Sequence, residues 1–235
     1  MEPMLRIAGL NVAYRAHHRP PVSILRNAEL TLNEGEAVGI YGESGGGKTT
    51  LTRAIMRLLP AHGQVDGQIV YRGEDLLHLP AERMRRLRGA SIGLIPQEPS
   101  VALNPVMRIQ SQVAEVIHTH CPLDWKRAQD AARSRLENFF GPNADRIARS
   151  YPHQLSGGER QRVVIAQAVC CSPALLIADE PASALDTITQ YEVLTLLRQL
   201  RNQASMALLY VSHSRAALNF VADRCLELRD GRFVR

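Results

Sequence analysis

The sequence predicts an α/β fold in which a parallel sheet forms the core and a helical segment is inserted into it. Near both ends of the 235-residue chain, short apolar strands alternate with helical segments, a pattern typical of parallel strands joined by right-handed crossovers. Between about 100 and 170 the patterns are helical only, over a length that suits a small folding unit. A glycine-rich segment also joins a strand to a helix at residues 42–49. We therefore expect one domain, with residues 1–99 and 171–235 as the core and about 100–170 as a helical subdomain.

Periodicity and turn residues place the individual elements of this fold. Pro20-Pro21 and neighbouring polar residues make 15–23 a predicted loop between the first two strands. The expected strands are residues 4–14, 24–32, 36–41, 68–71, 91–95, 174–178, 206–211 and 224–228. The expected helices are residues 50–59, 109–120, 125–140, 158–171, 187–201 and 215–221, with a short one starting near Pro80.

Composition is that of an ordinary globular protein, and it narrows the possible partners. Hydrophobic residues make up 45% of the chain and charged residues 22%, so a proper core can form. No apolar run approaches the ~20 residues of a membrane span, and the start lacks the pattern of a secretory signal. We expect a cytosolic chain that can dock on a membrane protein. Its four cysteines, Cys121, Cys170, Cys171 and Cys225, are then expected as buried free thiols.

The net charge of +5 and the pI of about 9.3 would suit nucleic acid or an anionic membrane surface. The densest basic stretch, residues 83–88, has no interleaved aromatic residues for base stacking, and a solvated helix face explains it better. No nucleic acid partner is expected. A metal site at His118, His120 and Cys121 is also disfavoured, because positions i and i+2 do not share a helix face.

Residues 42–49 carry the strongest chemical signal in the chain. They read Gly-Glu-Ser-Gly-Gly-Gly-Lys-Thr, the phosphate-loop pattern GxxxxGK[ST], between an apolar strand and a helix. Glycines let successive N–H groups point inward at a phosphate chain, and the helix N-terminus favours negative charge. We expect Lys48 to reach the β- and γ-phosphates and the Thr49 hydroxyl to bind Mg²⁺.

A second chemical signal is the apolar strand that ends in Asp179-Glu180. At the tip of such a strand, beside the phosphate loop, Asp179 can orient Mg²⁺, usually through water. Glu180 is then placed to polarise an attacking water molecule. We prefer this interpretation to a plain surface turn because the two acids occur together with a phosphate loop.

A third signal is the segment Leu-Ser-Gly-Gly-Glu at residues 155–159, which we call the Ser156 loop. It opens a helix, so free N–H groups and a positive helix end again favour an anion. The chain already holds one phosphate cradle, and a second one suggests that another molecule's nucleotide is gripped in trans. The weaker interpretation is a simple helix N-cap.

These motifs together resemble the ATP-binding-cassette (ABC) ATPases over essentially the whole chain. The resemblance rests on residues 42–49, Gln97, residues 155–159, Asp179-Glu180, residues 183–186 and His213, in that order. It implies a P-loop NTPase core with a parallel sheet, an antiparallel β subdomain and an inserted helical subdomain. It also implies that the chain hydrolyses ATP and uses ATP and Mg²⁺.

The resemblance implies a role for each matching residue. Tyr14 would stack on adenine, and His213 would contact the γ-phosphate. Gln97 would sense Mg²⁺ and the nucleophilic water. The implied catalytic residues are therefore Gln97, Glu180 and His213, and the implied metal ligands are Thr49, Gln97 and Asp179. Asp186 would lie in a loop between two subunits. The implied nucleotide contacts are Tyr14, Gly42, Glu43, Ser44, Gly45, Gly46, Gly47, Lys48, Thr49, Thr50, Ser156, Gly157, Gly158 and Asp186.

Three of these residues have simpler alternatives. Tyr14 can be a packing aromatic, Gln97 a turn residue between Pro96 and Pro99, and His213 a histidine at a strand end.

Segments 95–105, 151–162 and 176–181 resemble the oligopeptide/dipeptide/nickel branch of bacterial importers. Ser214 stands where Asp is usual, and Pro181-Ala182-Ser183 stands where Pro-Thr-Thr is common. Many peptide importers of this branch carry a C-terminal Cys/Pro-rich tail, and the sequence reaches Arg235 without one. This somewhat favours nickel or a small metal chelate over peptides as the expected cargo.

The resemblance implies a homodimer or heterodimer with a second ABC ATPase subunit, closing head to tail around two Mg·ATP. Further partners would be two membrane permease subunits and an extracytoplasmic solute-binding protein, so the chain would lie peripherally on the cytoplasmic face of the inner membrane. Two alternatives stay open. One is a soluble ABC ATPase in DNA repair or cofactor assembly, which lacks support because no long coiled-coil or zinc insert is present. The other is a regulatory subunit that binds ATP without turnover.

Overall fold

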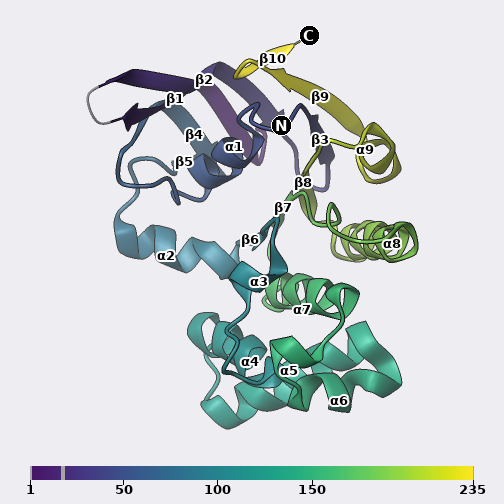
Figure 1. The fold of residues 1–235 in the computed structure, drawn as a ribbon. Coiled ribbons are helices and arrows are strands. Elements are labelled where there is room, and N and C mark those ends of the chain that lie inside the picture. The colour runs from purple at the N-terminus through teal and green to yellow at the C-terminus, as the bar shows by residue number, and fades with distance from the viewer. Residues whose placement is uncertain (1, 17–18, 235) are drawn as a thin grey trace. The chain divides into compact units, whose positions relative to one another are not determined.

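The computed structural model describes residues 2–16 and 19–234, and the chain divides into two compact units (Figure 1). One unit comprises Met1–Arg85 with Arg201–Arg235, and the other comprises Arg86–Leu200. Both crossings between them fall inside helices, α2 (Ala81–Ala90) and α8 (Thr187–Ala204). The helical segment expected at about 100–170 lies within the second unit, together with two strands.

An antiparallel sheet forms one part of the first unit. Its strands run in the order β2-β1-β4-β5, and every neighbouring pair is antiparallel. Alternate residues such as Leu5, Ile7 and Leu30 are buried, as expected for a sheet with one apolar face. The strands are β1 (Leu5–Ala16), β2 (Arg19–Leu32), β4 (Gly63–Tyr71) and β5 (Glu74–Asp75).

The other part of the first unit is a set of parallel strands. Strand β3 (Ala37–Tyr41) lies between β8 (Ala207–Ser212) and β9 (Arg224–Arg229) and is parallel to both. Four of the five residues of β3 and all six of β8 are buried, which explains their continuous apolar character. Strand β10 (Arg232–Val234) pairs antiparallel with β9. The helices are α1 (Lys48–Ile55) and α9 (Arg215–Val221).

The second unit combines two parallel strands with a helical bundle. Strand β6 (Ile92–Ile95) pairs in parallel with β7 (Leu175–Asp179). Side chains such as Val113, Leu136 and Val163 are fully buried between the helices. The helices are α3 (Pro99–Ala102), α4 (Ile109–His120), α5 (Trp125–Phe140), α6 (Ala144–Arg149) and α7 (Gly157–Val169), with 3₁₀ turns at Gly141–Asn143 and Pro152–Gln154.

The structure corrects several local predictions. The loop predicted at 15–23 is wrong over most of its length, because β1 continues to Ala16 and β2 begins at Arg19; His17 and His18 lie outside the described residues. The helix predicted at 50–59 begins at Lys48 and ends at Ile55, where Met56 caps it and Arg57 adopts a positive φ of 49°. All four thiols are free, but only Cys170 is buried as expected; Cys121 and Cys171 are partly exposed and Cys225 is exposed.

Within the described ranges 2–16 and 19–234, none of the helices combines the length and apolar character that a membrane span requires.

Candidate functional site

The phosphate-loop segment connects the end of β3 to the start of α1. The Gly46 N–H donates to the Glu43 carbonyl at 3.1 Å, which folds the loop back on itself. The Lys48 ammonium, 4% exposed, donates to the carbonyls of Gly42 and Glu43 at 2.9 Å each. The loop is thus held by its own lysine, with a cation fixed beside the first N–H groups of the helix.

Glycine at position 47 is required by the backbone. Gly47 is the N-cap of α1 and has φ 97°, a left-handed conformation that other residues rarely adopt. A Cβ atom there would lie 2.9 Å from a side-chain carbon of Leu25. The sequence motif therefore marks a turn that only glycine can make without strain.

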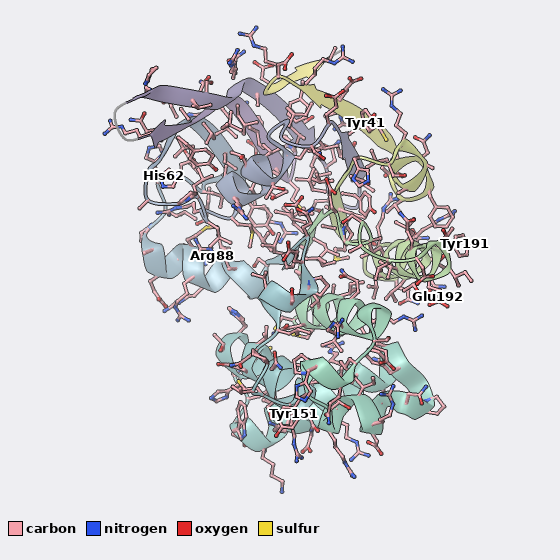
Figure 2. The ribbon with its side chains drawn as sticks, viewed as in Figure 1. Tyr41, His62, Arg88, Tyr151, Tyr191 and Glu192 are labelled. Carbon is pink, nitrogen blue, oxygen red and sulfur yellow. The ribbon has the colours of Figure 1, made fainter. Side chains whose placement is uncertain are left out.

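Tyr14 and His213 lie near this loop from other elements of the first unit. The Tyr14 hydroxyl is 3.5 Å from the Thr50 hydroxyl in the first turn of α1, and its ring lies 5.4 Å from that of His62, labelled in Figure 2. Residue Tyr41 at the end of β3 pairs with Ser212 at the end of β8, so exposed His213 follows at the same edge as Gly42. The first unit thus brings Tyr14, residues 42–50 and His213 together.

The sequence did not point to a polar pocket of about 710 Å³ that borders residues 42–46. Arg215 stands on its rim with its guanidinium 4.5 Å from the ring centre of Tyr41 (labelled in Figure 2) and 3.3 Å from the Glu227 carboxylate. Only the parallel pairing of β3 with β9 brings residues 41 and 227 together, so no local sequence signal could have found it.

In the second unit, Gln97, Asp179 and Glu180 follow neighbouring strands at the same edge. Ile95 of β6 pairs with Ala178 of β7, so the strands deliver Gln97 and the two carboxylates side by side along the sheet. Gln97 is exposed, whereas Asp179 and Glu180 are 4% and 9% exposed. Glu180 has φ 47°, an uncommon conformation for a residue with a Cβ atom.

A hydrogen-bonded turn holds Glu180 in this conformation. The Ser183 N–H donates to the Glu180 carbonyl at 3.2 Å, and the Ser183 hydroxyl donates to the same oxygen at 3.1 Å. Ser183, one of the departures from the family pattern, therefore supplies a hydroxyl that braces the turn after β7. Left-handed conformations of this kind cluster at functional sites.

The Ser156 loop is a complete capping box at the start of α7. The Ser156 hydroxyl accepts from the Glu159 N–H at 3.2 Å, and the Ser156 N–H donates to the Glu159 carboxylate at 2.9 Å. A guanidinium N–H of Arg146, from α6, donates to the other oxygen of Glu159. Burial acts to raise the pKa of Glu159, but the Ser156 hydrogen bond and the Arg146 charge outweigh it and lower the pKa.

Asp186 lies beside the same loop, around a pocket of about 440 Å³ that Gly157 and Gly158 also line. One carboxylate oxygen accepts from the N–H groups of Ile188 and Thr189, and the other accepts from the Thr189 hydroxyl at 2.7 Å. These hydrogen bonds, the Thr189 N–H foremost, lower the pKa of Asp186. Asp186 therefore caps α8 within its own chain, and its predicted contact with a second subunit stays a prediction.

The two glycines of the Ser156 loop differ in what surrounds them. A Cβ atom on Gly158 would lie 2.5 Å from the Thr189 methyl carbon, so packing within the chain demands glycine there. A Cβ atom on Gly157 would meet only Leu185, at an ordinary 3.8 Å. The glycine at 157 has no such packing reason among the described residues, which is consistent with a ligand that approaches the backbone.

The donor set fits ATP and Mg²⁺. N–H groups at the starts of α1 and α7, with the ammonium of Lys48, suit phosphate oxygens. Thr49 in the first unit, and Gln97 and Asp179 in the second, each carry a side-chain oxygen of the kind that Mg²⁺ prefers. The roles assigned to these residues stay predictions.

Comparisons with known proteins agree with the geometry. Residues 25–183 match the family model described as ABC transporter. The chain is 40% identical over 240 residues to a Brucella melitensis protein provisionally named a peptide import ATP-binding protein, spanning 99% of this chain and 71% of that one. It is 36% identical over 232 residues to the oligopeptide transport ATP-binding protein OppD of Haemophilus influenzae, spanning 99% and 72%.

A third relative is the glutathione import ATP-binding protein GsiA of Salmonella typhimurium, 39% identical over 238 residues, covering 98% of this chain and 38% of that protein. Among solved structures, the chain resembles one chain of the ATP-binding cassette MJ0796, solved as a dimer bound to ADP and Pi. The TM-score is 0.86 at 26% identity, over 99% of this chain and 97% of the other.

Proposed function

The chain belongs to the ABC transporter family of ATPases, and we propose that it powers the import of peptides or similarly small solutes. The observation that carries the proposal is the occurrence, in one chain, of a lysine-anchored phosphate loop and a separate capping-box loop with an open glycine. The names of the relatives, which refer to peptide, oligopeptide and glutathione import, support the direction and the cargo class.

In the first unit, residues 42–50 bind the phosphates of ATP and Tyr14 stacks on adenine. The Lys48 ammonium turns from its own loop carbonyls toward the β- and γ-phosphates, and because it is already fixed beside them, little ordering is required. His213, at the same strand edge, contacts the γ-phosphate. Thr49 of this unit, with Asp179 and Gln97 of the second unit, would hold Mg²⁺, which would supply positive charge to the phosphate oxygens.

In the second unit, Glu180 orients the attacking water and accepts its proton, and Gln97 positions the same water molecule. Glu180 is 9% exposed and its backbone carbonyl is bonded by Ser183, so the residue is held in place, as positional catalysis of phosphoryl transfer requires. The Ser156 loop, with the N–H groups of Gly157 and Gly158, grips the γ-phosphate bound to another subunit.

Two subunits, identical or paralogous, thus close head to tail around two ATP molecules, with Asp186 in the loop between them. ATP drives this change because it binds the closed dimer better than the open one. The helical part of the second unit and the Gln97 segment pass the closure to two permease subunits at the cytoplasmic face of the membrane. An extracytoplasmic binding protein delivers the cargo.

Co-purification from native membranes tests the transport role. We would tag the chain, solubilise membranes in mild detergent, and identify what it retains. Recovery of two multi-span permeases supports the proposal, whereas recovery of soluble proteins alone contradicts it and favours a soluble ABC ATPase. A regulatory subunit without turnover would be recovered with permeases but show no hydrolysis of its own.

The cargo is tested in the recovered complex with its binding protein. ATP hydrolysis in proteoliposomes is measured with glutathione, short peptides, or a nickel chelate added to the binding protein. Stimulation by peptides or glutathione supports the proposed cargo class. Stimulation by the nickel chelate alone contradicts the proposed cargo class and replaces it with a metal cargo.

A further inference from the structure

The Ser156 loop contains a charge that opposes its proposed task. Glu159 is the acidic residue in the first turn of α7, where its carboxylate complements the helix dipole. A phosphate that approaches the N–H groups of Gly157 and Gly158 must come close to this carboxylate. The same charge that stabilises the free helix end therefore repels the ligand the loop is proposed to grip.

The pocket beside the loop is unfavourable to an anion for the same reason. Its described lining includes the carboxylates of Glu159, Asp186 and Glu192 against the single guanidinium of Arg162. Arg162 pairs with Glu192, labelled on α8 in Figure 2, at 2.5 Å. The Asp186 carboxylate accepts hydrogen bonds from the start of α8. Glu159 directly follows Gly157 and Gly158 in the chain, so its carboxylate is the one that the loop itself carries.

Arg146 offsets this charge from behind the loop. Its guanidinium bonds one oxygen of Glu159, and the Ser156 N–H bonds the other at 2.9 Å. The position of Arg146 is fixed because its neighbours Ala144, Ile147 and Ala148 are buried. The Ser150 hydroxyl also donates to the Arg146 carbonyl at 2.7 Å. A packed helix thus presents a cation to the one carboxylate of the capping box.

We propose that Arg146 is a positioning residue for the Ser156 loop: its pairing with Glu159 neutralises the loop and lets it accept a partner subunit's γ-phosphate. The inference rests on the proposed function, since it concerns the loop that closes on a second subunit. It makes the affinity of closure depend on a residue outside the sequence motif. Glu159 keeps its capping role, which an uncharged glutamine can also fill.

Three variants and a control test this proposal in the Glu180→Gln background, where we expect closed dimers to accumulate. Arg146→Met leaves the Glu159 carboxylate unneutralised, and we expect the ATP concentration for half-maximal dimerisation to rise about tenfold. Glu159→Gln combined with Arg146→Met removes the charge but keeps the capping hydrogen bond, and should restore the parental value. Glu159→Gln alone should dimerise at least as well as the parent.

Arg133→Met is the matched control. Arg133 is 50% exposed, like Arg146, and pairs at 2.8 Å with Asp145 rather than with the Ser156 loop. We expect it to leave dimerisation unchanged. Dimer formation is measured by analytical ultracentrifugation, and nucleotide binding to the monomer by calorimetry, which no variant should alter. Because the defect is electrostatic, raising salt from about 0.05 M to about 0.5 M should narrow the gap.

The outcomes separate the two proposals. If Arg146→Met dimerises like the parent, or if Glu159→Gln fails to rescue it, the charge role of Arg146 is wrong. A failure to rescue with lowered thermal stability would give Arg146 a structural role instead. If the Glu180→Gln parent itself forms no ATP-dependent dimer, the proposed function fails before Arg146 is reached.

Discussion

At the scale of single residues, Glu180 combines burial with an uncommon backbone. Its φ of 47° lies outside the range of the extended β7, and the Ser183 hydroxyl donates to the Glu180 carbonyl. Such a conformation costs on the order of 1 kcal/mol or more and persists only where the surroundings impose it. The backbone at Glu180 is therefore held in one conformation, which suits a residue that orients water.

Replacing Glu180 by Gln should leave ATP binding intact and reduce hydrolysis at least ~100-fold, since general-base catalysis contributes about that much or more. Binding is measured by calorimetry and turnover by phosphate release. Asp179→Asn serves as a comparison that should also weaken Mg²⁺-dependent binding. Near-normal turnover in Glu180→Gln would remove Glu180 from the mechanism.

The contrast between Gly157 and Gly158 leads to a second residue-scale prediction. Gly157→Ala should fold with a stability within about 0.5 kcal/mol of the parent, because its Cβ atom has room in the chain. It should still lose about 100-fold in turnover, since a small displacement of the ligand is costly. Steady-state ATPase rates and urea unfolding check both parts, and full activity would argue against a ligand at residue 157.

Gly158→Ala is the companion variant with the opposite cause. Its Cβ atom would meet the Thr189 methyl group at 2.5 Å, so overpacking should cost about 1–3 kcal/mol of stability. Thr189→Ser removes that methyl group and keeps the hydroxyl that bonds Asp186, so the double variant should regain most of the loss.

The identities of the predicted site residues follow from spacing, but their surroundings do not. The pattern at residues 42–49 predicts a turn at Gly47, because the conformational freedom of glycine is a property of the residue itself and can be read from the sequence. Arg146 and Arg215 escaped prediction because each acts through a partner that tertiary packing supplies. Arg146 is one of many arginines in the chain, and nothing near it in sequence marks it as the partner of Glu159.

At the scale of elements, Ser214 explains how the chain tolerates one departure from its family. Its hydroxyl accepts from the Ala217 N–H at 3.3 Å and caps α9, and its N–H donates to the Ser212 hydroxyl at 3.0 Å. Serine and aspartate are comparable N-caps. The replacement therefore preserves the start of the helix that follows His213.

Ser214→Ala should lower the free energy of unfolding by about 1 kcal/mol, the usual value for a lost N-cap. Ser214→Asp should match the parent or exceed it slightly, because a negative charge complements the N-terminus of α9. Urea unfolding followed by circular dichroism measures both variants. Equal stability of the Ala and Ser forms would show that the cap contributes nothing.

The cap of α8 should make folding sensitive to acid. Hydrogen bonds from Thr189 lower the pKa of Asp186 below its ordinary 3.8. Because the folded-state pKa is the lower one, the stabilisation is present above the unfolded value and is lost as pH falls through the folded one. Asp186→Asn should therefore flatten the fall in unfolding midpoint between about pH 5 and pH 3. An unchanged pH profile would contradict the role of this cap.

Most elements were predictable because their buried faces impose a period. The strands 36–41 and 206–211 read as apolar runs because both of their faces are covered. The segment 15–23 was wrongly predicted as a loop. Pro20-Pro21 signals a turn, but antiparallel pairing with β1 extends β2 back to Arg19. Short elements such as α6 and β5 were missed because a few residues carry no measurable period.

At the scale of the whole molecule, each unit carries half of the predicted chemistry. The first unit holds Tyr14, residues 42–50 and His213, and the second holds Gln97, the Asp179-Glu180 pair and the Ser156 loop. The alternation of strands and helices predicts the fold class. The division into two compact units could not be predicted from composition, because its two boundaries fall within α2 and α8 rather than in glycine- or proline-rich linkers.

Dimer closure should be blocked by two variants through different routes. In the Glu180→Gln background, Lys48→Ala should lose nucleotide affinity in the monomer, because it removes the only lysine of the phosphate loop. Ser156→Arg should bind nucleotide normally but form no dimer, since a bulky side chain fills the gripping loop. Calorimetry and ultracentrifugation together separate the two. Loss of monomer binding in Ser156→Arg would show that its loop is misassigned.

The bonds that Lys48 makes to Gly42 and Glu43 bear on how fast the nucleotide can enter. A loop already closed by its own side chain needs no rearrangement of the backbone before a phosphate chain arrives, so association is limited by diffusion and orientation. Stopped-flow traces with a fluorescent nucleotide should then show a single phase whose rate rises linearly with concentration. A slow step in the ATPase cycle would then lie in the association of two subunits rather than in the binding of ATP.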